Sequence, residues 1–323
     1  PSGGSNSVRR GPDAATLARA MQPLPRAFER LRDRVRQAAT RPFSHAPSPL
    51  EHTLAYDGDP GLFGPDSATW AIIGDVASFL GGVRALLVQA AHPEVVAGVV
   101  DHSAYQEDPL GRLSRTSAYV AATAFGAMPE VERAVDIVRR AHRTVAGTSH
   151  RGRPYAASMP PLAAWVHNAL TDSFLTAYRT FGPRSCSQSE ADRFVSEQTR
   201  LGRMLGGDPL PEDAAGLAAW LVGCPDAGAS PGMRQTLAFL RAPPLHGSVR
   251  LGYAVLFHGA VATLPPRIRK ILGLRRAPGA LLAARLLIAS MRWAMGSSPA
   301  WQLALQRCHA PIPPARFRAP APP

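Results

Sequence analysis

Polar side chains that could bind a ligand are concentrated in the stretch HPEVVAGVVDHSAYQEDPLGRLSRT. Arg112 and Thr116 are four residues apart in it, so a helix would place them on one face together with Tyr119. An arginine and a threonine on a partly apolar face are costly to bury unless both find hydrogen-bond partners. Two interpretations are open. Arg112 is a surface residue that pairs with Glu107 or Asp108, or Arg112 and the Thr116 hydroxyl bind a ligand that carries a carboxylate.

Two histidines are candidate metal ligands. The first, His142, is in helical register with four valines of an apolar stripe: Val131, Val135, Val138 and Val145. A lone histidine on such a face is more often a core residue than a ligand, but a large cofactor that needs one axial nitrogen, such as haem, would favour the ligand. The second, His167 in WVHNALTDSF, shares a helical face with three apolar residues: Leu170, Phe174 and Tyr178.

Other classes of site have no support in the sequence. There is no HExxH motif, no Glu-x-x-His pair and no carboxylate cluster for a non-haem metal. Motifs of kinases and dinucleotide-binding proteins (the P-loop, GxGxxG after a strand) are also missing. Cys186, Cys224 and Cys308 are far apart, which predicts free thiols in a reducing compartment and a cytoplasmic protein. The chain begins at Pro1, which leaves room for a leader removed by processing.

The net charge of +13 does not by itself indicate a nucleic-acid partner. Of the 36 basic residues only Lys270 is a lysine, a bias typical of coding-sequence composition across the whole chain. The arginines are dispersed, with no run of five and no aromatic ladder between them, so specific nucleic-acid recognition is not expected. A weak affinity for anionic surfaces is expected.

The elements that must position these side chains are helices. Apolar residues recur at helical spacing, and no β-branched alternation is long enough for a strand. We predict an all-α protein with these helices: 17–39, 76–90, 109–125, 129–146, 162–181, 190–205, 212–222, 232–241, 248–263, 267–273, 279–295 and 299–308.

No linker divides the chain, so we expect one helical domain over residues 16–310. It follows a disordered Gly/Ser/Pro-rich segment, 1–15, and precedes a disordered proline-rich tail, 311–323. No stretch reaches the roughly 18 uncharged apolar residues that would span a bilayer. Residues 279–296 come closest, but they carry Arg285 and Arg292 and are predicted to form an amphipathic core helix.

The segments RALLVQAAHPEVVAGVVDHS, RLSRTSAYV, AHRTVAG and WVHNALTDSFLTAY, in this order, resemble the MpaB-type oxygenases. That family includes the rubber-degrading latex-clearing proteins and a fungal enzyme that cleaves a prenyl side chain. The resemblance covers Gly74 to Phe181, about a third of the chain, with a looser helical likeness beyond. It implies a helical fold with a globin-like core around a b-type haem.

The resemblance also implies roles for individual residues. The family's Arg-x-x-x-Thr motif matches Arg112 and Thr116, which would anchor the cofactor. Arg115 stands where the rubber enzymes have a lysine and would steer dioxygen. The family's axial histidine best fits His142, with His167 as the alternative. No acidic residue matches the catalytic glutamate of the rubber enzymes, which argues against polyisoprene as the substrate.

The expected function is therefore that of a haem b-dependent oxygenase, with dioxygen as co-substrate and an apolar, alkene-bearing small molecule as substrate. Oxidative cleavage of a C=C bond is the reaction most consistent with the resemblance. One alternative is a helical protein that binds haem or a lipid-like ligand without turnover. Another is a basic protein attached to a membrane or to nucleic acid. No sequence feature specifies an oligomeric state.

Overall fold

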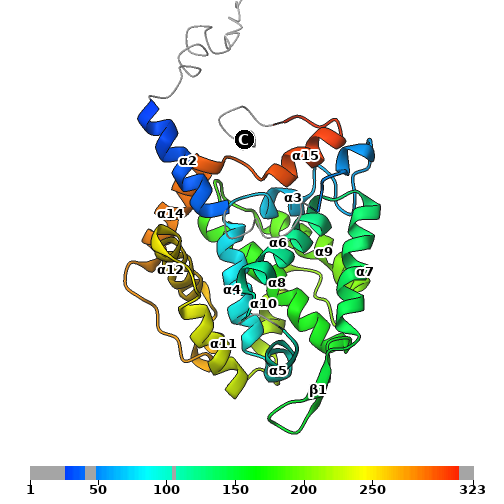
Figure 1. Ribbon diagram of the computed structural model, residues 1–323. Coiled ribbons are helices and arrows are strands. Elements are labelled where there is room, and N and C mark those ends of the chain that lie inside the picture. The colour runs from blue at the N-terminus through cyan, green and yellow to red at the C-terminus, as the bar shows by residue number, and fades with distance from the viewer. Residues whose placement is uncertain (1–25, 41–48, 104–106, 313–323) are drawn as a thin grey trace, which may run out of the picture.

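The computed structural model describes residues 26–40, 49–103 and 107–312, and these residues are predominantly α-helical (Figure 1). The all-α prediction is therefore confirmed, whereas the globin-like arrangement of the core stays a prediction. The predicted disordered segment 1–15, the start of the first predicted helix and the tail from residue 313 lie outside the described residues. The described part of the first helix is α2 (Arg26–Thr40).

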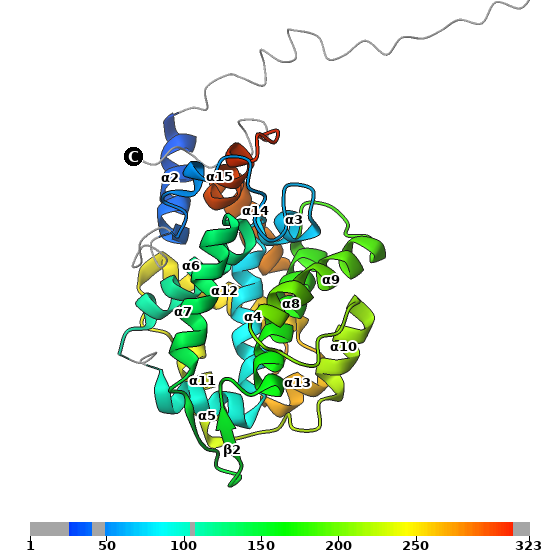
Figure 2. The same cartoon turned by 90° about the vertical axis from the view of Figure 1, so that its right-hand side faces the viewer.

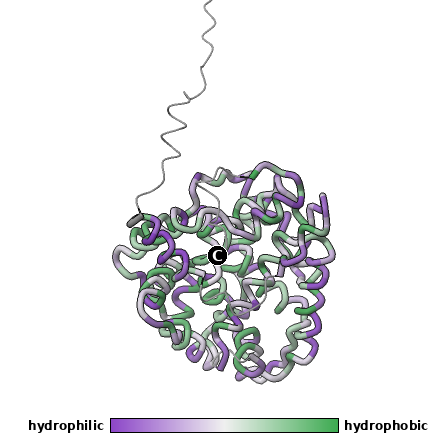
Figure 3. The backbone as a smooth tube through the Cα atoms, turned by 45° about the horizontal axis from the view of Figure 1, so that its top comes forward, coloured by the Kyte–Doolittle hydropathy of each residue, from purple (hydrophilic) through white to green (hydrophobic). Residues whose placement is uncertain are grey.

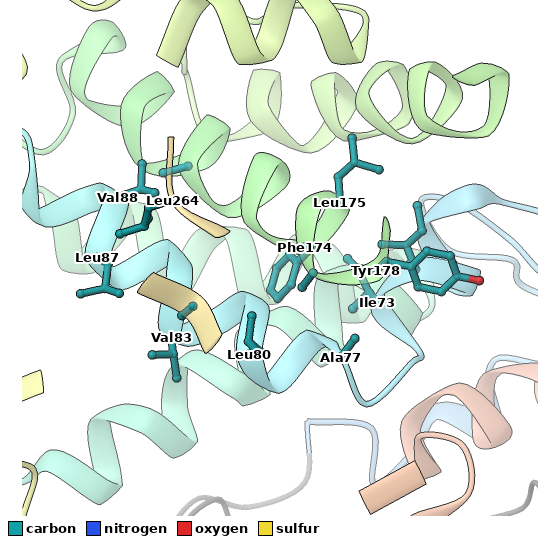
Figure 4. Close-up of a cluster of buried hydrophobic side chains, with 14 of the residues drawn as sticks. Ile73, Ala77, Leu80, Val83, Leu87, Val88, Phe174, Leu175, Tyr178 and Leu264 are labelled. Atoms are coloured by element: carbon teal, nitrogen blue, oxygen red, sulfur yellow. The ribbon is translucent and has the colours of Figure 1, made fainter. Parts of the chain in front are cut away.

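Two helices form the centre of the molecule, α4 (Ser78–Ala90) and α8 (Pro160–Phe181). Figure 4 shows Leu80 of α4 facing Phe174 of α8, and both side chains are buried. Burying a side chain of this size contributes roughly 1.5–3 kcal/mol. Gly81 allows the close approach, because a Cβ atom there would lie 2.7 Å from the Phe174 ring. One ion pair is embedded in this contact, between Arg84 Nη1 and Asp172 Oδ2 at 2.6 Å.

Two groups of helices flank this pair (Figures 1 and 2). On one side α12 (Gly247–Thr263) packs against α4, and α14 (Ala280–Met295) packs against α12 and α2. On another side lie α6 (Pro109–Phe125) and α7 (Met128–His142). The remaining helices close the ends and edges: η2 (Thr53–Ala55), α3 (Ala68–Ile73), α5 (Pro93–His102), α9 (Gln188–Met204), α10 (Ala214–Gly223), α11 (Pro231–Arg241), α13 (Pro266–Ile271) and α15 (Pro299–Arg307).

Most predicted helices from Pro109 onward agree with the structure to within a few residues. Two short helices, α3 and α5, were not predicted. Pro93 does end α4 as expected, but it is also the first residue of α5. Proline suits both positions, because it blocks helix continuation yet its fixed φ favours the first turn of the next helix.

One small sheet interrupts the helices where a loop was expected. β1 (Ala146–Thr148) and β2 (Pro154–Ala156) pair antiparallel, with Gly147 opposite Tyr155. Strands of three residues are too short to produce a visible alternation in the sequence. The turn between them uses Gly152 at φ +72°, a conformation that glycine adopts readily.

Hydrophilic and hydrophobic stretches alternate along much of the backbone in Figure 3, as expected for helices that turn one face to a core. In the described part of the chain no single helix is long and apolar enough to cross a membrane. The bent pair α4 and α5, with 106° between its halves, meets the criterion by length and composition only.

Candidate functional site

The predicted site residues other than His167, which is on α8, come from a hairpin of two helices, α6 and α7, which lie side by side in Figure 2. Asp108 starts α6, because its carboxylate accepts a hydrogen bond from the Gly111 amide at 2.9 Å. Only Gly126 and Ala127 separate the two helices, so they run antiparallel. The hairpin therefore has a closed end at residues 125–128 and an open end formed by the start of α6 and the end of α7.

A buried polar network fixes the closed end. Glu130 accepts hydrogen bonds from the Ala127 amide at 2.9 Å and from the Thr53 hydroxyl at 2.8 Å. Arg307, which is 1% exposed, donates to the Phe125 carbonyl at 2.9 Å. Buried charges are stable only where they are paired and hydrogen-bonded. A ligand at this end would have to break these hydrogen bonds, at a large cost in free energy. A ligand site on the hairpin must lie toward the open end.

An antiparallel hairpin is expected to place Arg112 level with His142. With a rise of 1.5 Å per residue, each lies about 21 Å of helix axis from the turn, and Thr116 lies about one turn closer. Hairpin geometry therefore predicts that Arg112, Thr116 and His142 lie toward the open end, together with Arg115.

The polar groups of α6 face outward at this end. Arg115 pairs with Asp108 at 3.0 Å, and more than half of each side chain is exposed. Such an exposed pair is worth little, so it can rearrange at small cost. The exposed Thr116 hydroxyl donates to the Arg112 carbonyl at 3.0 Å, and Arg112 itself is half-buried. Arg115 thus pairs with Asp108, one of the two acids that the sequence offered as a partner for Arg112.

The three residues predicted to share one face of α6, Arg112, Thr116 and Tyr119, differ in burial. Thr116 is exposed, whereas the Tyr119 hydroxyl is buried and has no partner among the described residues. Burial raises the pKa of Tyr119 far above its usual value of 10.0. The last turn of α6 is buried throughout, whereas in its earlier turns Gly111 and Ser114 are buried and Arg115 and Thr116 are exposed.

His142 is the last residue of α7 and is half-buried. The valine stripe that it continues is buried at Val131 and Val135 and only half-buried at Val138 and Val145. The stripe therefore leaves the core as it approaches His142. Burial lowers the pKa of His142 below its usual 6.5. A neutral imidazole keeps the lone pair that a metal ligand needs.

His167 is enclosed instead, with 4% of its surface exposed. Its Nε2 lies 2.8 Å from the carbonyl oxygen of Gln198, which can only accept, so Nε2 carries the proton. Burial lowers the pKa of His167 to about 4, so the ring is neutral at pH 7. The adjoining cavity, which Tyr119 also lines, measures about 20 Å³. That is space for about one water molecule, far too little for a macrocycle.

A larger cavity of about 380 Å³ opens at the N-terminal end of α8, where Pro161 and Trp165 line it. Its walls include three rings in sequence: His92 lies 5.3 Å from Trp165, which lies 5.8 Å from Trp220 (centroid distances). His92 is 5% exposed, and burial lowers its pKa. His92 belongs to the polar stretch that the sequence singled out, but no sequence signal connected it to Trp220.

The chemistry of the donor set at the open end fits a haem. Among the described residues no three His, Cys, Asp or Glu side chains come together as metal ligands. An iron held by a porphyrin needs only one nitrogen from the protein, with cationic and hydroxyl donors for the propionates. His142, which is half-buried and has a lowered pKa, would supply the nitrogen, and Arg112 and Thr116 would supply the donors.

Comparison with known proteins supports an oxygenase fold family. A family model described as "ER-bound oxygenase mpaB/B'/Rubber oxygenase, catalytic domain" matches residues 70–293, more than half of the chain. The match contains every predicted site residue and extends well beyond the Gly74–Phe181 resemblance. No curated protein and no solved structure matches this chain.

Proposed function

This chain belongs to the mpaB/rubber oxygenase family, and on that premise we propose that it is a haem b-dependent oxygenase of an apolar small molecule. An oxygenase catalytic domain implies dioxygen and a small-molecule substrate. The observation that carries the haem assignment is that His142, the last residue of α7, is half-buried and has a lowered pKa, so that its ring is neutral.

His142 would bind the iron through its imidazole lone pair. Because its pKa is lowered, no proton competes for that lone pair at neutral pH. His167 is the weaker candidate, because its Nε2–H is used by the Gln198 carbonyl and its ring is enclosed. A bound haem would supply the redox-active iron that reacts with dioxygen.

The α6 residues would hold the cofactor and orient the reactants. The Arg112 guanidinium and the Thr116 hydroxyl would donate to a haem carboxylate, the charge-assisted contact that arginine makes best. Arg115 would use its positive charge to orient dioxygen, and its exposed pair with Asp108 would open at little cost. The substrate would be an alkene-bearing molecule, cleaved at the C=C bond to two carbonyls. This last step rests on family likeness, since a fold does not determine a reaction.

The test begins with the absorption spectrum of the purified protein and a pyridine haemochrome assay. We expect a Soret band and a haem b signature. Dioxygen is then added to the reduced protein with candidate alkenes, and products are identified by mass spectrometry. Haem without dioxygen-dependent product would indicate a binding protein, and absence of a Soret band after haem supplementation would contradict the proposal.

A further inference from the structure

The net charge of the chain is confined to its C-terminal part. Arginines occur throughout, but all 23 acidic residues lie at or before Asp226. The 97 residues after it contain 13 basic residues and no acid, which accounts for the whole net charge of +13. Residues 1–226 are therefore neutral overall. In the described structure the charged part comprises α11 to α15.

The helix α14 in this part has large apolar residues on both of its faces. Its buried positions are Ala280, Ala284, Ile288, Met291, Ala294 and Met295, whereas Leu282 and Leu286 are 62% and 64% exposed. One face therefore packs in the core as predicted, but the outward face carries large apolar residues beside the exposed Arg285. Leu282, Leu286 and Trp293 fall on one stripe, since their spacing of 4 and 7 residues matches the helical period. The stripe is about 16 Å long.

Neighbouring helices extend this stripe. Figure 1 shows α14 beside α12 and α2, and both helices pack against it. Of the 12 large apolar residues exposed in the described structure, these three helices carry seven: Phe28, Leu31, Leu251, Leu281, Leu282, Leu286 and Trp293. Leu251 of α12 is 71% exposed. We call these seven side chains the apolar face. A concentration of this kind on one side of a protein marks an interaction surface.

Exposed basic residues occur on α12 and α14 and in the segment that joins them. Five of them make no ion pair with a described residue: Arg250, Lys270, Arg275, Arg276 and Arg285. Arg250 adjoins Leu251, and Arg285 adjoins Leu286. Long basic side chains can extend from an apolar surface and place their charges at a polar boundary. Leucines and a tryptophan bordered by such charges are typical of helices that lie in the interface of an anionic bilayer.

We propose that the apolar face docks on an anionic lipid bilayer, with α14 in the plane of the interface. A second copy of the chain fits less well, because it would bring the arginines of two copies of α12 and α14 together, and the only acids on the three helices of the apolar face are Glu29 and Asp33 of α2. The segments of this chain outside the described residues fit poorly as well, since 1–25, 41–48 and 313–323 each carry more arginines than acids. Nucleic acid would use the positive charge but not the exposed leucines.

The test is sedimentation of the full chain with two kinds of vesicle, phosphatidylcholine alone and phosphatidylcholine with phosphatidylglycerol. We expect binding to the anionic vesicles, a strong decrease from 0.05 to 0.5 M salt, and little binding to the neutral vesicles. Leu286→Glu should weaken partition into anionic vesicles about tenfold or more, because a leucine that enters the bilayer interface is replaced by a charged side chain. Leu54→Glu is the matched control, an exposed leucine on η2, and should change partition less than twofold.

Two further variants test the details. Vesicle binding should shift tryptophan emission to the blue, and Trp293→Phe should remove most of that shift, because Trp293 lies on the apolar face. Replacing Arg275 and Arg276 with glutamine should weaken binding to anionic vesicles more than the same change at Arg200 and Arg203 on α9.

Equal binding to both vesicles, no binding to either, or equal effects of Leu286→Glu and Leu54→Glu would overturn the proposal. So would a dimer that Leu286→Glu converts to monomer without any vesicle binding. None of these measurements depends on haem or catalysis, so the result is separate from the proposed oxygenase function.

Discussion

His142 and His167 occupy similar positions in the sequence, each on an apolar helix face with apolar residues at helical spacing. The structure gives them different surroundings. His167 lies between α8 and α9, is 4% exposed and hydrogen-bonds to a backbone carbonyl. His142 is the last residue of α7, at the open end of the α6–α7 hairpin, and is half-buried.

The comparison teaches what separates a ligand from a core residue. A histidine that completes packing loses accessibility and commits a ring nitrogen to the protein, as His167 does. A histidine that is to bind a cofactor must remain neutral and accessible, and a cofactor of haem size must find space beside it. The α6–α7 hairpin shows the same difference between its two ends. At the closed end Glu130 and Arg307 are committed to hydrogen bonds within the protein, whereas the side chains at the open end are more exposed.

The largest effect is expected at His142. His142→Ala should abolish the spectrum of an imidazole-ligated haem and the oxygenase activity, because the iron loses its protein ligand. Added imidazole should restore part of the spectrum, since the vacated space admits the ring. His258→Ala, at an exposed histidine on α12, is the control and should leave the spectrum unchanged. A native haem spectrum in the His142→Ala variant would show that His142 is not the iron ligand.

At His167 the main effect should be on stability. His167→Ala should lower the free energy of unfolding by about 3–4 kcal/mol, because it leaves a cavity and an unpaired Gln198 carbonyl. Urea unfolding measures this loss. The folded fraction should still show the wild-type haem spectrum. Loss of the axial imidazole signal in this variant, but not in His142→Ala, would identify His167 as the ligand.

Stability should also depend on pH through His167. The unfolded ring titrates near 6.5 and the folded ring near 4, so the unfolded state binds the extra proton between these values. The free energy of unfolding is therefore not reduced by His167 above pH 6.5. It falls by up to about 3 kcal/mol as the pH drops toward 4. His167→Gln should flatten this part of the stability curve. An unchanged slope between pH 6.5 and 4 would show that His167 does not titrate as its burial requires.

Arg112 tests the opposite helix of the hairpin. Arg112→Ala should weaken haem binding by about 2 kcal/mol, roughly 30-fold, if the guanidinium binds a haem carboxylate. Far-ultraviolet circular dichroism should show little change in helix content. Arg133→Ala on α7, an exposed arginine near the middle of that helix, is the matched control. Full haem loading in the Arg112 variant would leave the anchoring role unsupported.

The smallest effect is expected at Thr116. Thr116→Val removes one neutral donor and should weaken haem binding by about 1 kcal/mol, roughly fivefold. Titration of the apoprotein with haem measures it. Combined with Arg112→Ala, the loss should be less than additive if both side chains bind the same carboxylate. Strict additivity would place them at separate positions.

The helices were largely predictable because helix formation depends on a local pattern. Asp108 with Pro109 specified the start of α6, and the apolar period specified α8 through Phe181. The signals failed where elements were shorter than two of their own periods. The three-residue strands at Ala146 and Pro154 and the short helix α3 gave no repeat to detect. Pro93 was recognised as a stop, but its second role as the first residue of α5 depends on the residues after it.

The candidate site was predictable in its residue types but not in its environment. Arg112, Thr116, Arg115, His142 and His167 could all be named from spacing and family likeness. That Arg115 pairs with Asp108, or that His92 meets Trp220, could not, because such contacts join side chains through the packing of helices distant in sequence. The exposure of each residue likewise depends on which neighbours cover it.

The amino-acid sequence by itself determined the all-α class, most helix boundaries, the family, and the acid-free composition of residues 227–323. These features depend on residue type and on neighbours within a few positions along the chain. Tertiary structure alone decided that His167 is enclosed while His142 is accessible, and that the leucines of α14 face outward. Periodicity shows that a helix has an apolar face, but burial depends on how many elements pack against that face. A ring of the same chemistry thus becomes part of the core at one position and is left available for a ligand at the other.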